Sequence, residues 1–94
     1  MIILNWSSSF RRAFKKKTKN DPEIKNKIIN TLSLLQQDPF LPNLKTHKLK
    51  GILEDTWACS INYDLRIIFD FVENKQSQET EILLINIGSH DEVY

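Results

Sequence analysis

The first forty residues pass from a short apolar run to positions spaced at the period of a helix. Residues 2–4 are β-prone and precede Trp6, which predicts an N-terminal strand. The serines at 7–9 supply hydroxyl groups that can cap a helix, and Phe10 and Phe14 share one face of it because they are four residues apart. We therefore expect a first helix directly after the serines.

The clearest period in the chain predicts a second helix. Asp21 provides a capping side chain and Pro22 suits the first helical position. The apolar positions then recur three or four residues apart, at Ile24, Ile28, Leu32 and Leu35. This helix should end near Gln37, ahead of an Asp-Pro break.

In the second half of the chain the hydrophobic period changes to two. Residues 57–63 alternate, with Trp, Cys, Ile and Tyr on one side, and residues 65–71 alternate in the same way. The pattern predicts two half-buried strands with a tight turn near Tyr63, Asp64 and Leu65. Residues 47–50 should form a short extended segment, and residues 81–88, which are apolar on both faces, should form a central strand.

These elements predict one α+β domain over residues 1–94, with an N-terminal strand and two helices packed on an antiparallel sheet. The composition agrees, because 40% hydrophobic and 27% charged residues are typical of a packed domain. The single cysteine excludes a disulfide framework and a cysteine-rich zinc site. No apolar run approaches the roughly 20 residues that span a bilayer, and no signal peptide is evident, so we expect a cytoplasmic protein without membrane association.

The charge is divided unevenly between the two halves of the chain. Residues 1–51 hold 11 Lys or Arg and 3 Asp or Glu, a net charge of +8, whereas residues 52–94 hold 2 and 9, a net charge of −7. Such asymmetry favours a polyanionic partner for the basic half, although mutual neutralisation in the folded protein explains it equally well. The candidate RNA-binding cations are Arg11, Arg12, Lys15 and Lys16 on the first helix and Lys45, Lys48 and Lys50 around the first histidine.

The residues that could carry chemistry are few. His47 and His90 are 43 residues apart and form no metal-binding spacing, so we expect neither a metal nor another cofactor. Arg66 alternates with apolar strand residues, and its planar guanidinium suits a phosphate. Each residue alone also fits a surface role. Together with the lysines they are the groups that metal-free RNA cleavage needs: a base for the 2′-hydroxyl, a cation for the phosphorane and an acid for the 5′-oxygen.

Three segments, LKTHKLKG, INYDLRIIF and ILLINIGSHDEVY, follow the two helices, and in this order the whole chain resembles the RelE/ParE toxin superfamily, in particular its YafQ-like branch. The resemblance implies a RelE-like fold and a toxin of a type II toxin–antitoxin module. Such a toxin is a ribosome-associated endoribonuclease that cuts mRNA by 2′-hydroxyl attack. It is neutralised by a cognate antitoxin, and it reaches operator DNA only through that antitoxin.

The resemblance also implies roles for individual residues. His47 and His90 match histidines used in cleavage, Asp64 a functional aspartate, Arg66 a common arginine and Tyr94 an aromatic residue that stacks on a base. The chain departs from the branch at two positions, since Ser60 stands where some members have histidine and Asn86 where some have arginine. Charge stabilisation would then depend on Arg66 with Lys48 or Lys50.

Local charge divides the two histidines between acid and base. Asp91 and Glu92 follow His90 and favour its cationic form, which suits a general acid. The lysines around His47 disfavour its cationic form, which suits a base, with Asp64 as a possible substitute.

Two other functions stay open. The first is a non-enzymatic ParE-like toxin that binds a protein target such as gyrase. That branch generally lacks the terminal histidine, so His90 favours the nuclease. The second is an inactive module that serves only to autoregulate its operon with the antitoxin.

Overall fold

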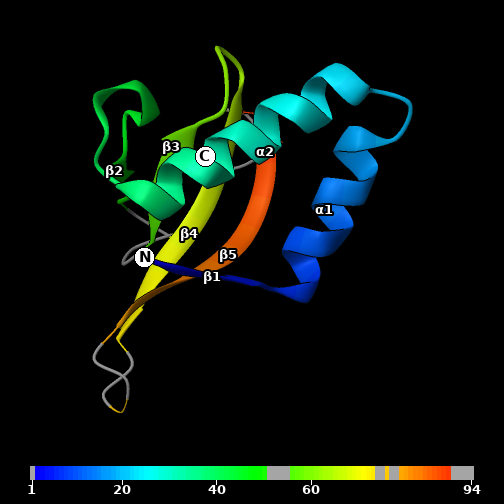
Figure 1. The fold of residues 1–94 in the computed structure, drawn as a ribbon. Coiled ribbons are helices and arrows are strands. Elements are labelled where there is room, and N and C mark those ends of the chain that lie inside the picture. The colour runs from blue at the N-terminus through cyan, green and yellow to red at the C-terminus, as the bar shows by residue number, and fades with distance from the viewer. Residues whose placement is uncertain (1, 51–55, 74–75, 77–78, 90–94) are drawn as a thin grey trace.

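The computed structural model describes residues 2–50, 56–73, 76 and 79–89. Its helices are α1 (Ser8–Thr18) and α2 (Pro22–Gln37), followed by one short 3-10 helix, η1 (Pro42–Leu44). Its strands are β1 (Ile3–Trp6), β2 (His47–Lys48), β3 (Trp57–Ser60), β4 (Leu65–Glu73) and β5 (Thr80–Ser89). The predicted α+β class is confirmed, with both helices against the sheet (Figure 1).

The strands form one sheet in the order β1-β5-β4-β3-β2. Strands β2 to β5 pair antiparallel, as expected, but β1 pairs parallel to β5, so the sheet is mixed. Strand β5 has a partner on each side, which confirms the central position predicted from its two apolar faces.

Side-chain caps begin both helices where the sequence predicts them. The hydroxyl of Ser7 accepts a hydrogen bond from the backbone N–H of Phe10 at 3.0 Å, and the carboxylate of Asp21 accepts one from Ile24 at 3.1 Å. Each bond satisfies an N–H that has no partner within its helix.

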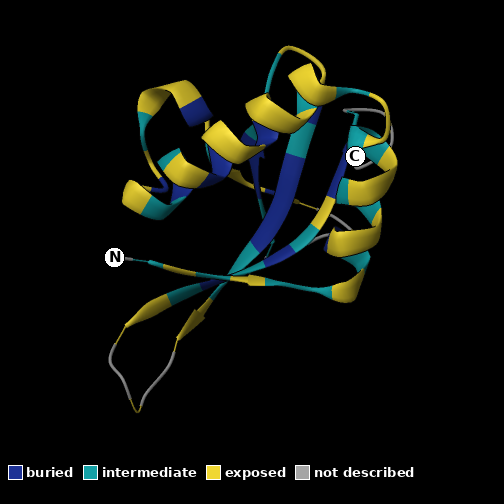
Figure 2. Ribbon diagram, turned by 45° about the vertical axis from the view of Figure 1, so that its right-hand side comes forward, coloured by how far each residue is buried: buried dark blue, intermediate teal, exposed yellow. Residues whose placement is uncertain are grey.

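One large hydrophobic core lies between the helices and the sheet (Figure 2). Helices α1 and α2 contribute Phe10, Ile28 and Leu35, and the sheet contributes Ile67, Phe69, Ile82 and Leu84, among others. A smaller cluster contains Leu49, Ala58 and Ile68. Along β3 and β4, Ala58 and Ile68 alternate with residues of the main core, so this cluster lies on the opposite face of the sheet. The sheet therefore has one face covered by α1 and α2 and a second face, the open face, that no helix of the described residues covers.

A β-bulge in β5 sets which residues reach each face. The pairing runs from Ile68 opposite Asn86 to Phe69 opposite Leu84, so Ile85 is the extra residue. The carbonyl oxygen of Ile85 instead accepts a hydrogen bond from the hydroxyl of Ser9 at 2.6 Å. The bulge shifts the alternation by one, and Leu84 and Ile87 consequently both reach the main core.

Strand β3 ends at Ser60, three residues earlier than the alternation predicts. The side-chain oxygen of Asn62 accepts hydrogen bonds from the N–H groups of Asp64 and Leu65, at 2.9 and 2.8 Å. This Asx turn takes N–H groups that a longer ladder would have used. The turn lies where the sequence predicts it, and Tyr63 within it is 97% exposed.

Candidate functional site

The strand register places several predicted residues on the open face. His47 is opposite Ala58, which is opposite Ile68, so these three lie in one row across the sheet. Ser60 and Arg66 are opposite each other in the next row on the same side, because residues two apart on a strand share a face. The open face thus carries His47 and Arg66 two strands apart in neighbouring rows.

A depression of about 300 Å³ lies where the β3–β4 turn meets the segment that leads into β2. It is lined by Asn43, Lys45, Ser60, Ile61, Asn62, Tyr63 and Arg66. Two cations, two amides and two hydroxyl groups therefore line one concave surface, and this lining can hold an anion together with neighbouring hydrogen-bonding groups.

The guanidinium of Arg66 is held by the backbone of the turn. Its Nη1 donates hydrogen bonds to the carbonyl oxygens of Asn62, Leu65 and Tyr63, at 2.8, 3.1 and 3.3 Å. Within the described ranges no carboxylate forms a salt bridge with this side chain. The positive charge is thus positioned by neutral acceptors, and it is not neutralised by a carboxylate of the described chain.

His47 is exposed on the edge strand β2. Its Nδ1 lies 3.0 Å from the carbonyl oxygen of Lys45. Because a carbonyl oxygen can only accept, Nδ1 carries the proton in this contact, and Nε2 of the neutral ring then holds the lone pair. A histidine in this tautomer can accept a proton at Nε2.

The other residues predicted for the site are distributed differently. Lys48 is opposite Trp57 in the register, so its position alternates with that of His47 and belongs to the other face. Lys50 is exposed beyond β2, and Asp64 is exposed in the β3–β4 turn. His90 and Tyr94 lie outside the described residues.

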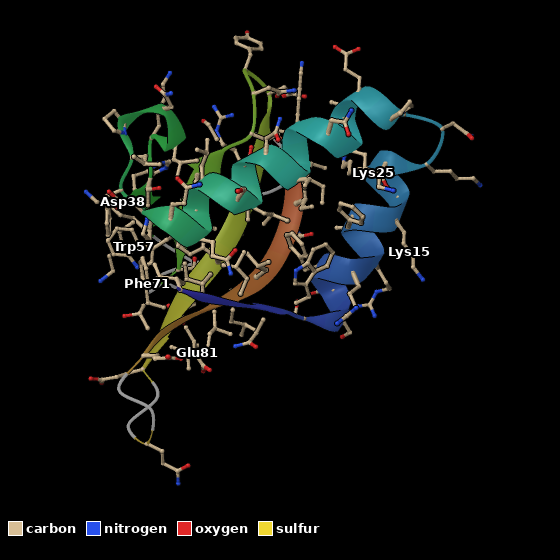
Figure 3. The ribbon with its side chains drawn as sticks, in the orientation of Figure 1. Lys15, Lys25, Asp38, Trp57, Phe71 and Glu81 are labelled. Carbon is tan, nitrogen blue, oxygen red and sulfur yellow. The ribbon has the colours of Figure 1, made fainter. Side chains whose placement is uncertain are left out.

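The cations of α1 are separated from the depression. Arg11, Arg12, Lys15 and Lys16 are exposed, and α1 packs against β5, whereas the depression borders β3 and β4 (Figure 1). Figure 3 shows the Lys15 side chain pointing outward from α1, away from the sheet. Among the described residues, the cations of α1 and those of the depression therefore form separate basic regions.

Five residues that line the depression are not among the site residues that the sequence predicts: Asn43, Ser60, Ile61, Asn62 and Tyr63. Asn62 lies in the predicted alternation, Tyr63 lies where this alternation meets the predicted turn, and Ser60 stands out only as a departure from the family. The signal for the turn was an asparagine two residues before an aspartate, a spacing typical of an Asx turn.

Cys59 is a buried thiol next to this site. Burial raises its pKa to about 12, although a backbone hydrogen bond with Ile67 and the nearby Arg66 charge both lower it. Such a thiol stays protonated at neutral pH and is a poor nucleophile.

The described residues include no group of three or more His, Cys, Asp or Glu side chains arranged to hold a metal ion. None of the helices in the described part of the chain is both long and apolar enough to cross a membrane.

The chain matches the family model described as a bacterial toxin of type II toxin–antitoxin system, YafQ, over residues 3–94. No curated protein matches it. Among solved structures, a copper-bound mutant toxin from Helicobacter pylori is 30% identical, with 100% of each chain covered and a TM-score of 0.70. A mutant of YafQ from E. coli is 17% identical with a TM-score of 0.78, and the E. coli DinJ-YafQ complex is 18% identical with a TM-score of 0.73. Both comparisons cover 100% of this chain and 99% of the other.

Proposed function

Because the chain belongs to the YafQ family of bacterial toxins from type II toxin–antitoxin systems, we propose that it is a cytoplasmic endoribonuclease that cuts mRNA on the ribosome. The observation that carries this proposal is the depression in which Lys45 and Arg66 converge beside Ser60 and Asn62. A phosphodiester is the anion that fits two cations and nearby hydrogen-bonding groups, and single-stranded RNA presents it in an accessible form.

In the proposed reaction, His47 Nε2 takes the proton of the 2′-hydroxyl. The 2′-oxygen attacks phosphorus, and the bond from phosphorus to the 5′-oxygen breaks, which leaves a 2′,3′-cyclic phosphate and a 5′-hydroxyl. Arg66 and Lys45 stabilise the charge on the phosphorane. Lys45 takes the role that the sequence suggested for Lys48 or Lys50, because it lines the depression with Arg66.

The remaining roles rest on the sequence and on the resemblance to the family. His90 donates a proton to the departing 5′-oxygen, and Tyr94 stacks on a base. Asp64, exposed in the turn, is the alternative base. Lys48 and Lys50 contribute to the positive field around the RNA.

We also propose that a cognate antitoxin covers α1 and the neighbouring groove. The groove has a volume of about 470 Å³ and is lined by Ile3, Leu4, Trp6, Ile29, Leu32, Ser33 and Gln36. Arg11 lies over the Trp6 ring, 5.9 Å from its centroid, so the apolar groove and the cations of α1 are contiguous. An antitoxin segment with apolar residues for the groove and acidic residues for α1 matches both properties. The E. coli relative was solved as a DinJ-YafQ complex.

The decisive experiment incubates the purified protein with ribosomes that carry a defined mRNA and maps the new RNA ends. We expect cleavage with 5′-hydroxyl ends in the wild type, and a 10²- to 10⁴-fold slower rate for His47→Gln and for His90→Gln, a typical loss for a general acid or base. Asn26→Gln, at an exposed position of α2, serves as the control.

A protein that leaves mRNA intact in this assay is not the proposed nuclease. Inhibition of gyrase in a supercoiling assay, together with intact mRNA, would instead support the ParE-like function.

A further inference from the structure

Tyr63 is the most exposed large apolar side chain that the described residues contain, at 97%. It lies in the β3–β4 turn, which extends beyond the sheet at the top of Figure 1, and it lines the depression that holds Lys45 and Arg66. The core does not use this ring. The fold therefore gives no packing reason for an aromatic residue at this position.

The backbone around Tyr63 is nevertheless fixed from both sides. The Asn62 side chain accepts hydrogen bonds from the N–H groups of Asp64 and Leu65, at 2.9 and 2.8 Å. The carbonyl oxygen of Tyr63 itself accepts from Arg66 Nη1 at 3.3 Å. The backbone that carries the ring is therefore pre-organised, so a ligand that stacks on it has to order only the Tyr63 side chain.

We infer that Tyr63 is a stacking platform for a base of the RNA whose phosphate lies in the depression. Proteins that bind single-stranded nucleic acid combine cations along the backbone with aromatic rings for the bases. Here the turn and the start of β4 supply both, since Arg66 provides the cation and also holds the carbonyl of Tyr63. The inference rests on the proposed nuclease function, and it adds Tyr63 to the site as an RNA-binding residue.

An RNA base fits this ring better than a protein partner does. The other residues that line the depression are mostly polar or cationic, with Ile61 the exception. A protein hot spot would instead surround the ring with apolar side chains that exclude water. The apolar groove between β1 and α2 provides such a surface elsewhere.

The test measures binding to ribosomes that carry mRNA with 2′-O-methylated nucleotides, which cannot be cleaved by 2′-hydroxyl attack, and cleavage of the unmodified mRNA. We expect Tyr63→Leu to weaken binding and to lower kcat/KM by about tenfold to hundredfold, because stacking on one base has that value. Tyr63→Phe keeps the ring and should stay within about twofold of the wild type. Phe40→Leu removes another exposed aromatic ring, away from the depression, and should change neither quantity.

Unchanged binding and cleavage in Tyr63→Leu would overturn the inference and leave the nuclease function standing. Loss of antitoxin binding with normal RNA binding would overturn it as well, and would assign the ring to the antitoxin interface. If the wild type does not cleave mRNA, the proposed function fails. Affinity for the methylated mRNA then still decides the role of Tyr63, because binding requires no cleavage.

Discussion

Arg66 Nη1 donates a hydrogen bond to the carbonyl oxygen of Asn62 at 2.8 Å, across the turn that joins β3 to β4. The same nitrogen reaches the carbonyl oxygen of Tyr63 at 3.3 Å. The side chain that we propose to stabilise the phosphorane thus also holds the turn that carries the stacking ring. Changes to Arg66 should consequently affect both the charge at the site and the geometry of the turn.

Arg66→Lys should separate charge from geometry. Lysine keeps the positive charge but loses the planar fork that can bond the turn and a phosphate together. We expect kcat/KM for mRNA cleavage to fall about 10²-fold or more, as is typical when a donor to a developing oxyanion is lost. The free energy of unfolding should fall by only about 1 kcal/mol, the contribution of an ordinary hydrogen bond. Normal cleavage, or a loss of stability that accounts for the whole loss of activity, would contradict the proposed role.

Asn62→Ala should destabilise the protein, because the N–H groups of Asp64 and Leu65 lose their acceptor. The expected cost is about 1–2 kcal/mol in a urea unfolding curve. Asn62→Asp is the matched variant, since its carboxylate can still accept both bonds. It should fold almost as stably as the wild type, yet cleave more slowly, because it adds a negative charge to the depression. Equal stability of all three proteins would show that the Asx turn has no part in holding the loop.

The sequence predicts the fold where local chemistry decides it. Caps at Ser7 and Asp21, with apolar residues at helical spacing, define both helices without reference to the rest of the chain. The parallel pairing of β1 with β5 could not be predicted, because alternation identifies strands and not their neighbours. The bulge at Ile85 cannot be predicted either. Residues on both faces of β5 are apolar, so a one-residue shift in the alternation does not change the hydrophobic pattern.

The candidate site was predictable in its charges but not in its shape. Arg66, His47 and Lys45 could be selected because their residue types carry the chemistry of phosphate transfer. Tyr63 could not, because it both continues the alternation of β3 and begins the predicted turn, so the pattern does not decide whether its ring is buried. Its exposure depends on the hydrogen bonds that the Asn62 side chain accepts from the turn, which compete with the strand ladder.

Charge reversal on α1 tests the proposed antitoxin surface. Arg12→Glu combined with Lys15→Glu replaces two exposed cations that lie apart from the depression. We expect the affinity for the antitoxin encoded beside this gene to fall at least about tenfold, because like charges then face an acidic segment. Lys27→Glu, on α2, is the control. Unchanged antitoxin affinity with a lost cleavage activity would instead make α1 a surface for RNA, the other role that the sequence suggests.

Cys59 provides a prediction about pH with a definite sign. Burial raises the pKa of this thiol from 9.0 to about 12 in the folded protein, so the folded state holds the proton more tightly than the unfolded state does. The corresponding stability is fully present below pH 9 and is lost as the pH rises toward 12. In that window the free energy of unfolding of the wild type should fall by up to about 1.4 kcal/mol more per pH unit than that of Cys59→Ala. The reason is that the folded wild type holds one proton that its unfolded state releases.

Urea unfolding curves recorded at several pH values between pH 8 and pH 10.5 measure this difference. Cys59→Ala is less stable throughout because it leaves a cavity, so the slope with pH and not the absolute stability decides the outcome. Other residues titrate in the same range, but they are common to both proteins and cancel in the comparison. The folded wild type should also resist alkylation by iodoacetamide at pH 8, at a rate set by unfolding, because only the thiolate reacts. Parallel stability curves for the two proteins, or rapid labelling of the folded wild type, would show that Cys59 does not have the raised pKa.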